Sequence, residues 1–314
     1  MSDNWERDVL EKLATEGLKE QRRARRWGIF FKLLGFGYLL IGLVMLLPLV
    51  VDSRQVSTGK HGNKHTALVE LNGVISSESD ASADNIVAAL RAAFEDKKAA
   101  GIVLRINSPG GSPVQSGYIY NEIIRLRKEH PNIPLYAVIS DICASGGYYV
   151  ASAAEKIYAD QASLVGSIGV RMDNFGFVDA MKKLGVERRT LTAGENKALM
   201  DPFAPSNPEI NKHMQTLLDD IHAQFIAAVK QGRGEKLKEV KGMFSGLIWT
   251  GEQSVEIGLV DQLGSTSYVA REVLKAEDIV DYTVRPDFFS RFANKVGVSM
   301  ASLLVEQGMN PILH

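Results

Sequence analysis

The sequence predicts an α/β domain built on a parallel sheet and preceded by one transmembrane helix. Two observations lead to this prediction. The first is an uncharged apolar run, Leu33–Val51. The second is a regular alternation of strand patterns with helical patterns of about 10–15 residues after residue 66, which is typical of parallel β-α-β units.

Composition narrows the class of protein. The 314 residues include 36 Lys and Arg against 37 Asp and Glu, so no excess charge favours nucleic acid. One cysteine, Cys143, rules out an intramolecular disulfide. None of the six histidines forms a convincing ligand pair, because His61 and His65 have helical spacing but lie in a polar, glycine-containing stretch. We therefore expect neither a metal site nor a cofactor.

The apolar run predicts a membrane anchor. Residues 28–51 would span roughly 35 Å as a helix, enough to cross a hydrocarbon core. A cleaved signal peptide would have a shorter apolar region and a small-residue cleavage site, and a core helix would keep a polar face. Five basic residues within 19–26 predict a cytoplasmic N-terminus, with the rest of the chain outside.

Five segments follow from this reading. They are a basic amphipathic cytoplasmic segment (1–27), the transmembrane helix (28–51), a linker (52–65), a catalytic domain (66–276) and a C-terminal tail (277–314).

Within the catalytic domain, strands and helices are predicted in turn. Strand patterns cover 66–75, 101–107, 134–140, 156–160 and 163–170. Helical patterns cover 85–96, 116–130, 146–154 and 207–233, followed by a helix, turn and helix over 250–276. The apolar stripe of the long helix is expected to pack into the core; it comprises Met214, Leu217, Leu218, Ile221, Phe225 and Ile226.

Three motifs follow strands, on the side where open parallel sheets bind ligands. "INSPGGS" (106–112) has two glycines that let backbone N–H groups approach a ligand, although an ordinary turn has the same composition. "ASGGYY" (144–149) puts Ser145 before a helix N-terminus, where it is either a nucleophile or a helix cap. "TAGENKALMDPFAP" (192–205) carries Lys197 in a loop, where a lysine is ordinarily just solvated.

Together the motifs suggest a serine–lysine pair. A serine nucleophile needs a proton acceptor, and no histidine lies in a segment that looks like a site. A lysine has an ordinary pKa near 10.4, so serving as base near neutral pH requires burial that lowers it by about three units. Apolar stretches such as "LVGSIGV" and "CASGGYYV" would provide such surroundings.

At this point the chain resembles the signal peptide peptidase A family, membrane-anchored bacterial serine proteases, in its short single-repeat form. The resemblance covers residues 66–276 and rests on "RINSPGGS", "ASGGYYVASAAEKIYA", "VGSIGV", "AGENKALMDP" and "GLVDQLG", in that order. It implies the fold of the Clp protease and the crotonases, a right-handed superhelix of β-β-α units.

The resemblance also implies roles for single residues. Ser145 matches the nucleophile, Lys197 the general base, and Ser167 a serine that orients the lysine amine. The oxyanion hole is expected to use the N–H of Gly111 and that of Gly146 or of Ser145 itself, with Gly110 as the fallback. Cys143 is expected to be a small buried hydrophobe, since nothing nearby would activate its thiol.

In short members of this family, subunits form a ring in which one supplies the serine and the next the lysine. The resemblance thus implies a homo-oligomeric ring with a shared dyad, acting on peptides at the outer side of the bacterial inner membrane. In a single chain, Ser145 and Lys197 should then be too far apart to hydrogen-bond. Two alternatives are a crotonase-type enzyme acting on acyl thioesters and an inactive scaffold that binds peptides or membrane proteins.

Overall fold

The computed structural model describes residues 22–23, 25–42 and 64–285. The chain divides into two compact units, and residues 64–285 belong to the unit that contains the sheet. Residues 22–23 and 25–42 of the other unit are helical. Among the described residues, no helix has both the length and the apolar character needed to cross a bilayer. The predicted span runs on to residue 51, and its part from residue 43 lies outside the described residues.

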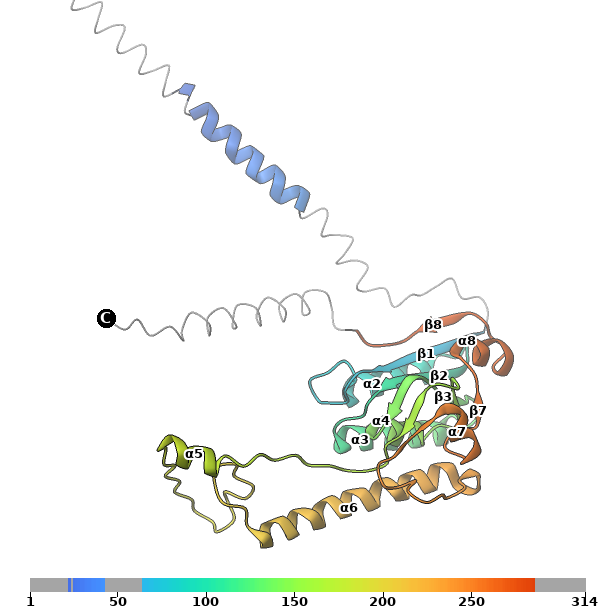
Figure 1. Ribbon diagram of the computed structural model, residues 1–314. Coiled ribbons are helices and arrows are strands. Elements are labelled where there is room, and N and C mark those ends of the chain that lie inside the picture. The colour runs from blue at the N-terminus through green and yellow to red at the C-terminus, as the bar shows by residue number, and fades with distance from the viewer. Residues whose placement is uncertain (1–21, 24, 43–63, 286–314) are drawn as a thin grey trace, which may run out of the picture. The chain divides into compact units, whose positions relative to one another are not determined.

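The sheet has eight strands in the order β6-β5-β3-β2-β1-β8, with β4 paired to β3 and β7 paired to β4 (Figure 1). All pairs are parallel except β5 with β6. The strands are β1 (His65–Asn72), β2 (Ala99–Ser108), β3 (Leu135–Ala144), β4 (Lys156–Ala159), β5 (Leu164–Gly166), β6 (Ile248–Thr250), β7 (Gln262–Leu263) and β8 (Ile279–Asp281). This confirms the predicted α/β class with a mainly parallel sheet.

The helices connect successive strands. They are α2 (Ala83–Glu95), α3 (Pro113–Glu129), α4 (Gly146–Ala151), α5 (Val178–Leu184), α6 (Pro208–Arg233), α7 (Gly251–Glu256) and α8 (Thr266–Tyr268), with a 3₁₀ turn η1 (Gly234–Lys236) and a π turn η2 (Val269–Val273). Local sequence sets their starts. α3 and α6 both have proline as first residue behind a capping side chain, Ser112 and Asn207 respectively.

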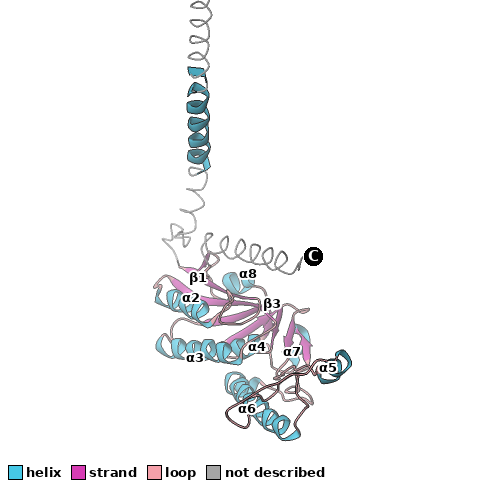
Figure 2. Ribbon diagram, turned by 90° about the vertical axis from the view of Figure 1, so that its left-hand side faces the viewer, coloured by secondary structure: helices cyan, strands magenta, loops and turns pink. Residues whose placement is uncertain are grey.

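Both faces of the sheet are covered (Figure 2). The larger core cluster lies between the sheet and α2, α3, α4 and the C-terminal part of α6, and includes Leu71, Ile86, Ile119 and Phe225. A smaller cluster on the other face packs Val103, Val138 and Tyr158 against Val269 of η2. Two apolar layers therefore hold the central strands rigid, which suits a site built on their carboxyl ends.

Strand β3 changes partner along its length. Tyr136–Ile139 pair with β4, and Ile142–Ala144 pair with β5. β2, β3 and β5 are neighbours and run parallel, so the residues that follow their carboxyl ends lie in one region. Open parallel sheets bind ligands at this edge. The residues after these three strands are those of the "PGG", "SGG" and "GSIG" motifs.

Two predicted boundaries differ in the structure. β1 begins at His65, which the sequence places in the linker, and residues 52–63 of that linker lie outside the described residues. β8 lies in the predicted tail but pairs with β1, so the domain extends at least to residue 285. β8 is a three-residue edge strand in which only Val280 is buried, so its pattern is too short to read.

The long helix also departs from its prediction. Of the six stripe residues only Phe225 is buried, and Leu217 is 41% exposed. The C-terminal part of α6 packs on α4, whereas its N-terminal half runs beyond the sheet (Figure 1). The predicted N-terminal segment before residue 22 and the tail after residue 285 lie outside the described residues.

Candidate active site

Ser145 lies between β3 and α4 in an unusual backbone conformation. Its φ is 51° and its ψ is −124°, a region that residues with a side chain rarely adopt. Its N–H donates a 2.8 Å hydrogen bond to the carbonyl of Gly166, and its side chain does not cap α4. Ser145 thus precedes the first residue of α4, but its hydroxyl accepts no capping hydrogen bond from that helix. Such strain is a feature of functional sites.

The glycine loop after β2 lies directly against this serine. A β-carbon on Gly110 would stand 2.7 Å from both the backbone nitrogen of Gly146 and the Cβ of Ser145. No larger residue fits there, and φ at Gly110 is +100°. The "PGG" and "SGG" motifs, 36 residues apart in the sequence, therefore lie against each other.

The two glycines of this loop differ in their N–H groups. The N–H of Gly110 donates to Ser108 Oγ at 3.1 Å. Within residues 64–285, the N–H groups of Gly111 and Gly146 donate no hydrogen bond. This difference favours Gly111 and Gly146 over the fallback Gly110 as donors to an oxyanion. The role itself stays a prediction.

Ser167 is brought next to Ser145. It follows Gly166, which pairs with Ala144 across β3 and β5, and its own φ is 50°. Its N–H donates a 2.7 Å hydrogen bond to Leu247, just before β6. Two serines with positive φ thus sit side by side at the ends of adjacent strands.

Lys197 lies in a long excursion, residues 170–207, which we call the arm. Its side chain is exposed and forms no hydrogen bond or ion pair with any residue in the described part of the chain. Its backbone N–H donates to Gly194 at 3.1 Å. The arm contains α5, which buries no residue and projects away from the sheet (Figure 1).

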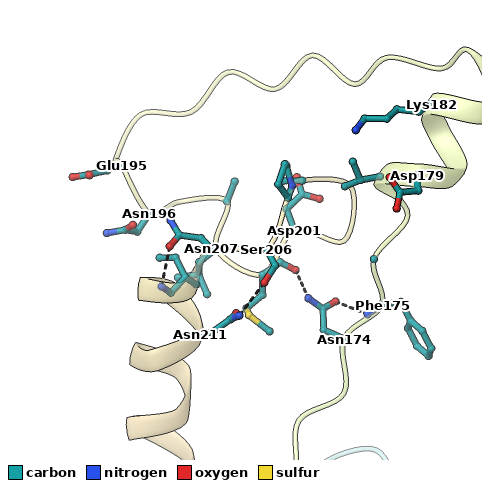
Figure 3. Close-up of a pocket in the computed structure, with 18 residues that line it drawn as sticks. Asn174, Phe175, Asp179, Lys182, Glu195, Asn196, Asp201, Ser206, Asn207 and Asn211 are labelled. Carbon is teal, nitrogen blue, oxygen red and sulfur yellow. Dashed lines mark hydrogen bonds between the residues drawn. The ribbon is translucent and has the colours of Figure 1, made fainter.

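In the described part of the chain, Lys197 makes no hydrogen bond with Ser145. The neighbouring Asn196 lines the same pocket as Asn207 and Asn211, at the start of α6 (Figure 3). The helix after Ser145 packs further along α6, where the rings of Tyr149 and Phe225 are 5.0 Å apart. The start of α6 and Phe225 are separated by about 25 Å at 1.5 Å per residue.

The arm encloses a pocket of about 780 Å³ with many polar side chains (Figure 3). Asn174 spans it, donating to the carbonyl of Met200 at 3.0 Å and accepting from the N–H of Phe175 at 2.9 Å. Neither serine lines this pocket. It is therefore a feature of the lysine loop and not of the serine site.

Two other chemistries find no support. Cys143 is fully buried, and burial raises the pKa of its thiol, so it carries no thiolate near neutral pH. In the described ranges, no group of three or more His, Cys, Asp and Glu side chains is placed to hold a metal ion.

Sequence reasoning gave no role to two features of the site. Ser108 belongs to the "INSPGGS" motif. Its position directly after a buried strand and before "PGG" is the sequence feature that could have indicated a role in the site. β6 was not predicted as a strand, yet the residue before it holds Ser167. Its three residues carry no readable alternation.

Comparison with known proteins gives the family. The model of peptidase family S49 matches residues 127–280. A putative signal peptide peptidase SppA of Enterococcus faecium is 32% identical over 230 residues, covering 71% of this chain and 66% of that protein. The putative protease slr0021 of a Synechocystis species is 34% identical over 202 residues, covering 64% of this chain and 70% of that protein.

A Na⁺/H⁺ antiporter NhaA of Brucella melitensis is 47% identical over 175 residues, which make up 56% of this chain. The match covers 24% of that protein, so this chain spans about a quarter of its length. The Enterococcus and Synechocystis proteins, by contrast, are matched over 66% and 70% of their own length. The resemblance inferred from the five motifs is confirmed, and the chain belongs to peptidase family S49.

Proposed function

We propose that this chain is a membrane-anchored serine endopeptidase that cleaves released signal peptides or unfolded exported segments. Ser145 is the nucleophile and Lys197 the general base, and neither a metal nor a cofactor takes part. The observation that carries the proposal is the strained Ser145 backbone beside the N–H groups of Gly111 and Gly146. A hydroxyl and two N–H donors facing one space can form and stabilise a tetrahedral adduct.

The proposed reaction has two stages. Ser145 Oγ attacks the scissile carbonyl carbon, its proton passes to Lys197 Nζ, and the carbonyl oxygen becomes an anion held by the Gly111 and Gly146 N–H groups. The C–N bond then breaks, and the leaving amine takes the proton from the lysine. In the second stage the same lysine takes a proton from water as the water oxygen attacks the acyl carbon. The bond from that carbon to Ser145 Oγ then breaks, and Oγ takes the proton back from the lysine.

The lysine is proposed to come from a neighbouring copy in a ring. Two features of the chain support this. Lys197 is exposed on an arm that leaves its own Ser145 without a base. The arm also exposes apolar side chains that water would not favour, and a neighbouring subunit would cover them; they are Met172, Phe175, Phe177, Leu184, Val186, Leu191, Leu199 and Phe203.

Anchoring and orientation belong to the same proposal. The apolar run 33–51 behind five basic residues supports a single-pass inner-membrane protein with its catalytic domain on the periplasmic side. A periplasmic reporter enzyme fused after Asp52 should be active. A silent reporter at that position, together with an active cytoplasmic one, would overturn the orientation.

Hydrolysis by the full-length protein tests the function. The wild-type chain should cleave a leader-derived peptide and an unfolded protein, and Ser145→Ala and Lys197→Ala should each abolish cleavage. A crotonase-type enzyme would act on an acyl thioester instead, and an inactive scaffold would bind the peptide without cleaving it. Cleavage that survives Ser145→Ala would refute the mechanism.

A further inference from the structure

Ser108, the last residue of β2, is fully buried beneath the candidate site. Its hydroxyl donates a 2.6 Å hydrogen bond to the carbonyl of Gly73 and accepts a 3.1 Å hydrogen bond from the N–H of Gly110. Because a hydroxyl has a single proton, donation to Gly73 leaves only its lone pairs for Gly110. The direction of both hydrogen bonds is therefore fixed.

These bonds join the segments that surround the nucleophile. Gly73 follows β1, and its N–H in turn donates to the Asn107 carbonyl at 2.9 Å. On the other side, a β-carbon on Gly147 would stand 3.0 Å from the Ser108 carbonyl oxygen. Ser108 thus lies between the end of β1, the glycine loop and the first turn of α4.

The contact with Gly110 determines which N–H groups remain for a ligand. The Gly110 N–H donates to Ser108, and the Gly110 carbonyl accepts a 2.9 Å hydrogen bond from the Ile75 N–H. The two bonds together fix the peptide that carries the Gly111 N–H. The Gly111 N–H donates no hydrogen bond to any other residue of the described chain. The Gly111 nitrogen lies beside Gly146, where a β-carbon would stand 3.3 Å from it. Without the hydroxyl, the buried N–H of Gly110 would lack an acceptor. This cost in free energy would favour a rotation of the loop that brings the N–H to another acceptor.

We propose that Ser108 is a positioning residue of the oxyanion hole: its hydroxyl takes up the Gly110 N–H and thereby aims the Gly111 N–H at the reacting carbonyl. This inference rests on the proposed function. It concerns transition-state binding, since the oxyanion exists only after attack by Ser145.

The test compares Ser108→Ala with wild type in the full-length protein, using a leader-derived peptide. We expect kcat to fall about ten- to a hundredfold, somewhat less than the loss of a whole oxyanion donor, with KM changed by no more than about twofold. Affinity for a peptide boronate, which forms a tetrahedral adduct on the serine, should fall by a similar factor. Affinity for the unreactive peptide amide should stay unchanged.

Ser152→Ala is the matched control. Ser152 is also fully buried, and its hydroxyl donates to the Tyr149 carbonyl at 2.7 Å at the far end of α4. The Ser152→Ala variant therefore loses a buried hydroxyl of the same kind. Unlike the Ser108 hydroxyl, this one accepts no hydrogen bond from the glycine loop. Its kcat and boronate affinity should stay within about twofold of wild type, since no transition-state contact is altered.

Ser108→Cys keeps the test decisive if Ser108→Ala fails to fold. A thiol is a weaker donor and acceptor of similar size, so kcat should fall between those of the serine and alanine variants. Wild-type kcat and boronate affinity in Ser108→Cys and in any folded Ser108→Ala would overturn the inference. That result leaves the proposed function standing, whereas cleavage that survives Ser145→Ala removes the function itself.

Discussion

The backbone N–H of Ser145 donates a 2.8 Å hydrogen bond to the carbonyl oxygen of Gly166, which fixes the candidate nucleophile to the strand that leads into Ser167. Both serines have φ near +50°. The bond closes the β3–β5 ladder at the Ala144–Gly166 pair, so the sheet itself holds the two serines at a common edge. Conformational strain at this point is thus maintained by regular backbone pairing.

The strain at Ser145 predicts an unusual order of stabilities. Ser145→Gly should be more stable than Ser145→Ala by about 1 kcal/mol, because glycine adopts φ 51° and ψ −124° with little steric cost. Both variants should be inactive. Urea unfolding of the full-length protein measures the difference.

Ser152 supplies the comparison, since its φ of −63° and ψ of −18° are helical. There the order should reverse, with glycine less stable than alanine by roughly 1 kcal/mol. If glycine is less stable than alanine by the same amount at both positions, the backbone conformation of Ser145 is not strained.

The proposed sharing of the dyad predicts complementation between two inactive variants. Mixed subunits of Ser145→Ala and Lys197→Ala place an intact serine beside an intact lysine at about one quarter of the sites in a randomly assembled ring. Coexpression followed by a peptide assay should recover activity of that order. Each variant alone should be inactive, and a mixture that stays inactive despite forming mixed oligomers would assign both residues to a single chain.

Burial of Cys143 predicts that its thiol is dispensable. The pKa of the thiol is raised by its burial two residues before Ser145, so it is neither a nucleophile nor an alkylation target. Cys143→Ala should retain cleavage within a few-fold, and iodoacetamide should not inhibit the wild-type protein. Inhibition that disappears in Cys143→Ala would show instead that the thiol is accessible.

Much of the fold was predictable because its signals are local. β1, β2 and β3 are buried apolar runs, and α2 and α3 have clear helical periodicity, so residues 66–154 match expectation closely. The motifs at the strand ends could be placed on one edge from topology alone, and the backbone of Ser145 does lie beside Gly110 and Gly166 there.

The remainder depends on contacts that a single sequence does not encode locally. The stripe on α6 predicts a buried face, but its N-terminal half has no element of the described chain packed over most of it. β6 and β8 exist through pairing with a neighbour and have too few residues to show alternation. The role of Ser108 depends on the direction of one hydroxyl, which no residue pattern specifies.

The ion pair of Arg233 with Asp261 predicts a large structural effect away from the site. Arg233 Nη1 lies 2.8 Å from Asp261 Oδ2, and the arginine side chain is fully buried at the end of α6. Asp261→Asn should lower the free energy of unfolding by about 3–5 kcal/mol, because it leaves a buried guanidinium without its counter-charge. Lys236 also pairs with Asp261 but is 46% exposed, so Lys236→Gln should cost no more than about 1 kcal/mol.

The same pair predicts how stability depends on pH. Burial pushes the pKa of the Asp261 carboxyl upward, but hydrogen bonds from Arg233 and Lys236 outweigh it, so the pKa lies below its ordinary value. The unfolded chain then binds this proton more readily than the folded chain, and the stabilisation is complete above about pH 4 and lost as the pH falls further. Urea unfolding between pH 7 and pH 3 should therefore show a smaller loss of stability in Asp261→Asn than in wild type. Equal losses in the two proteins would mean that the carboxylate contributes nothing through its charge.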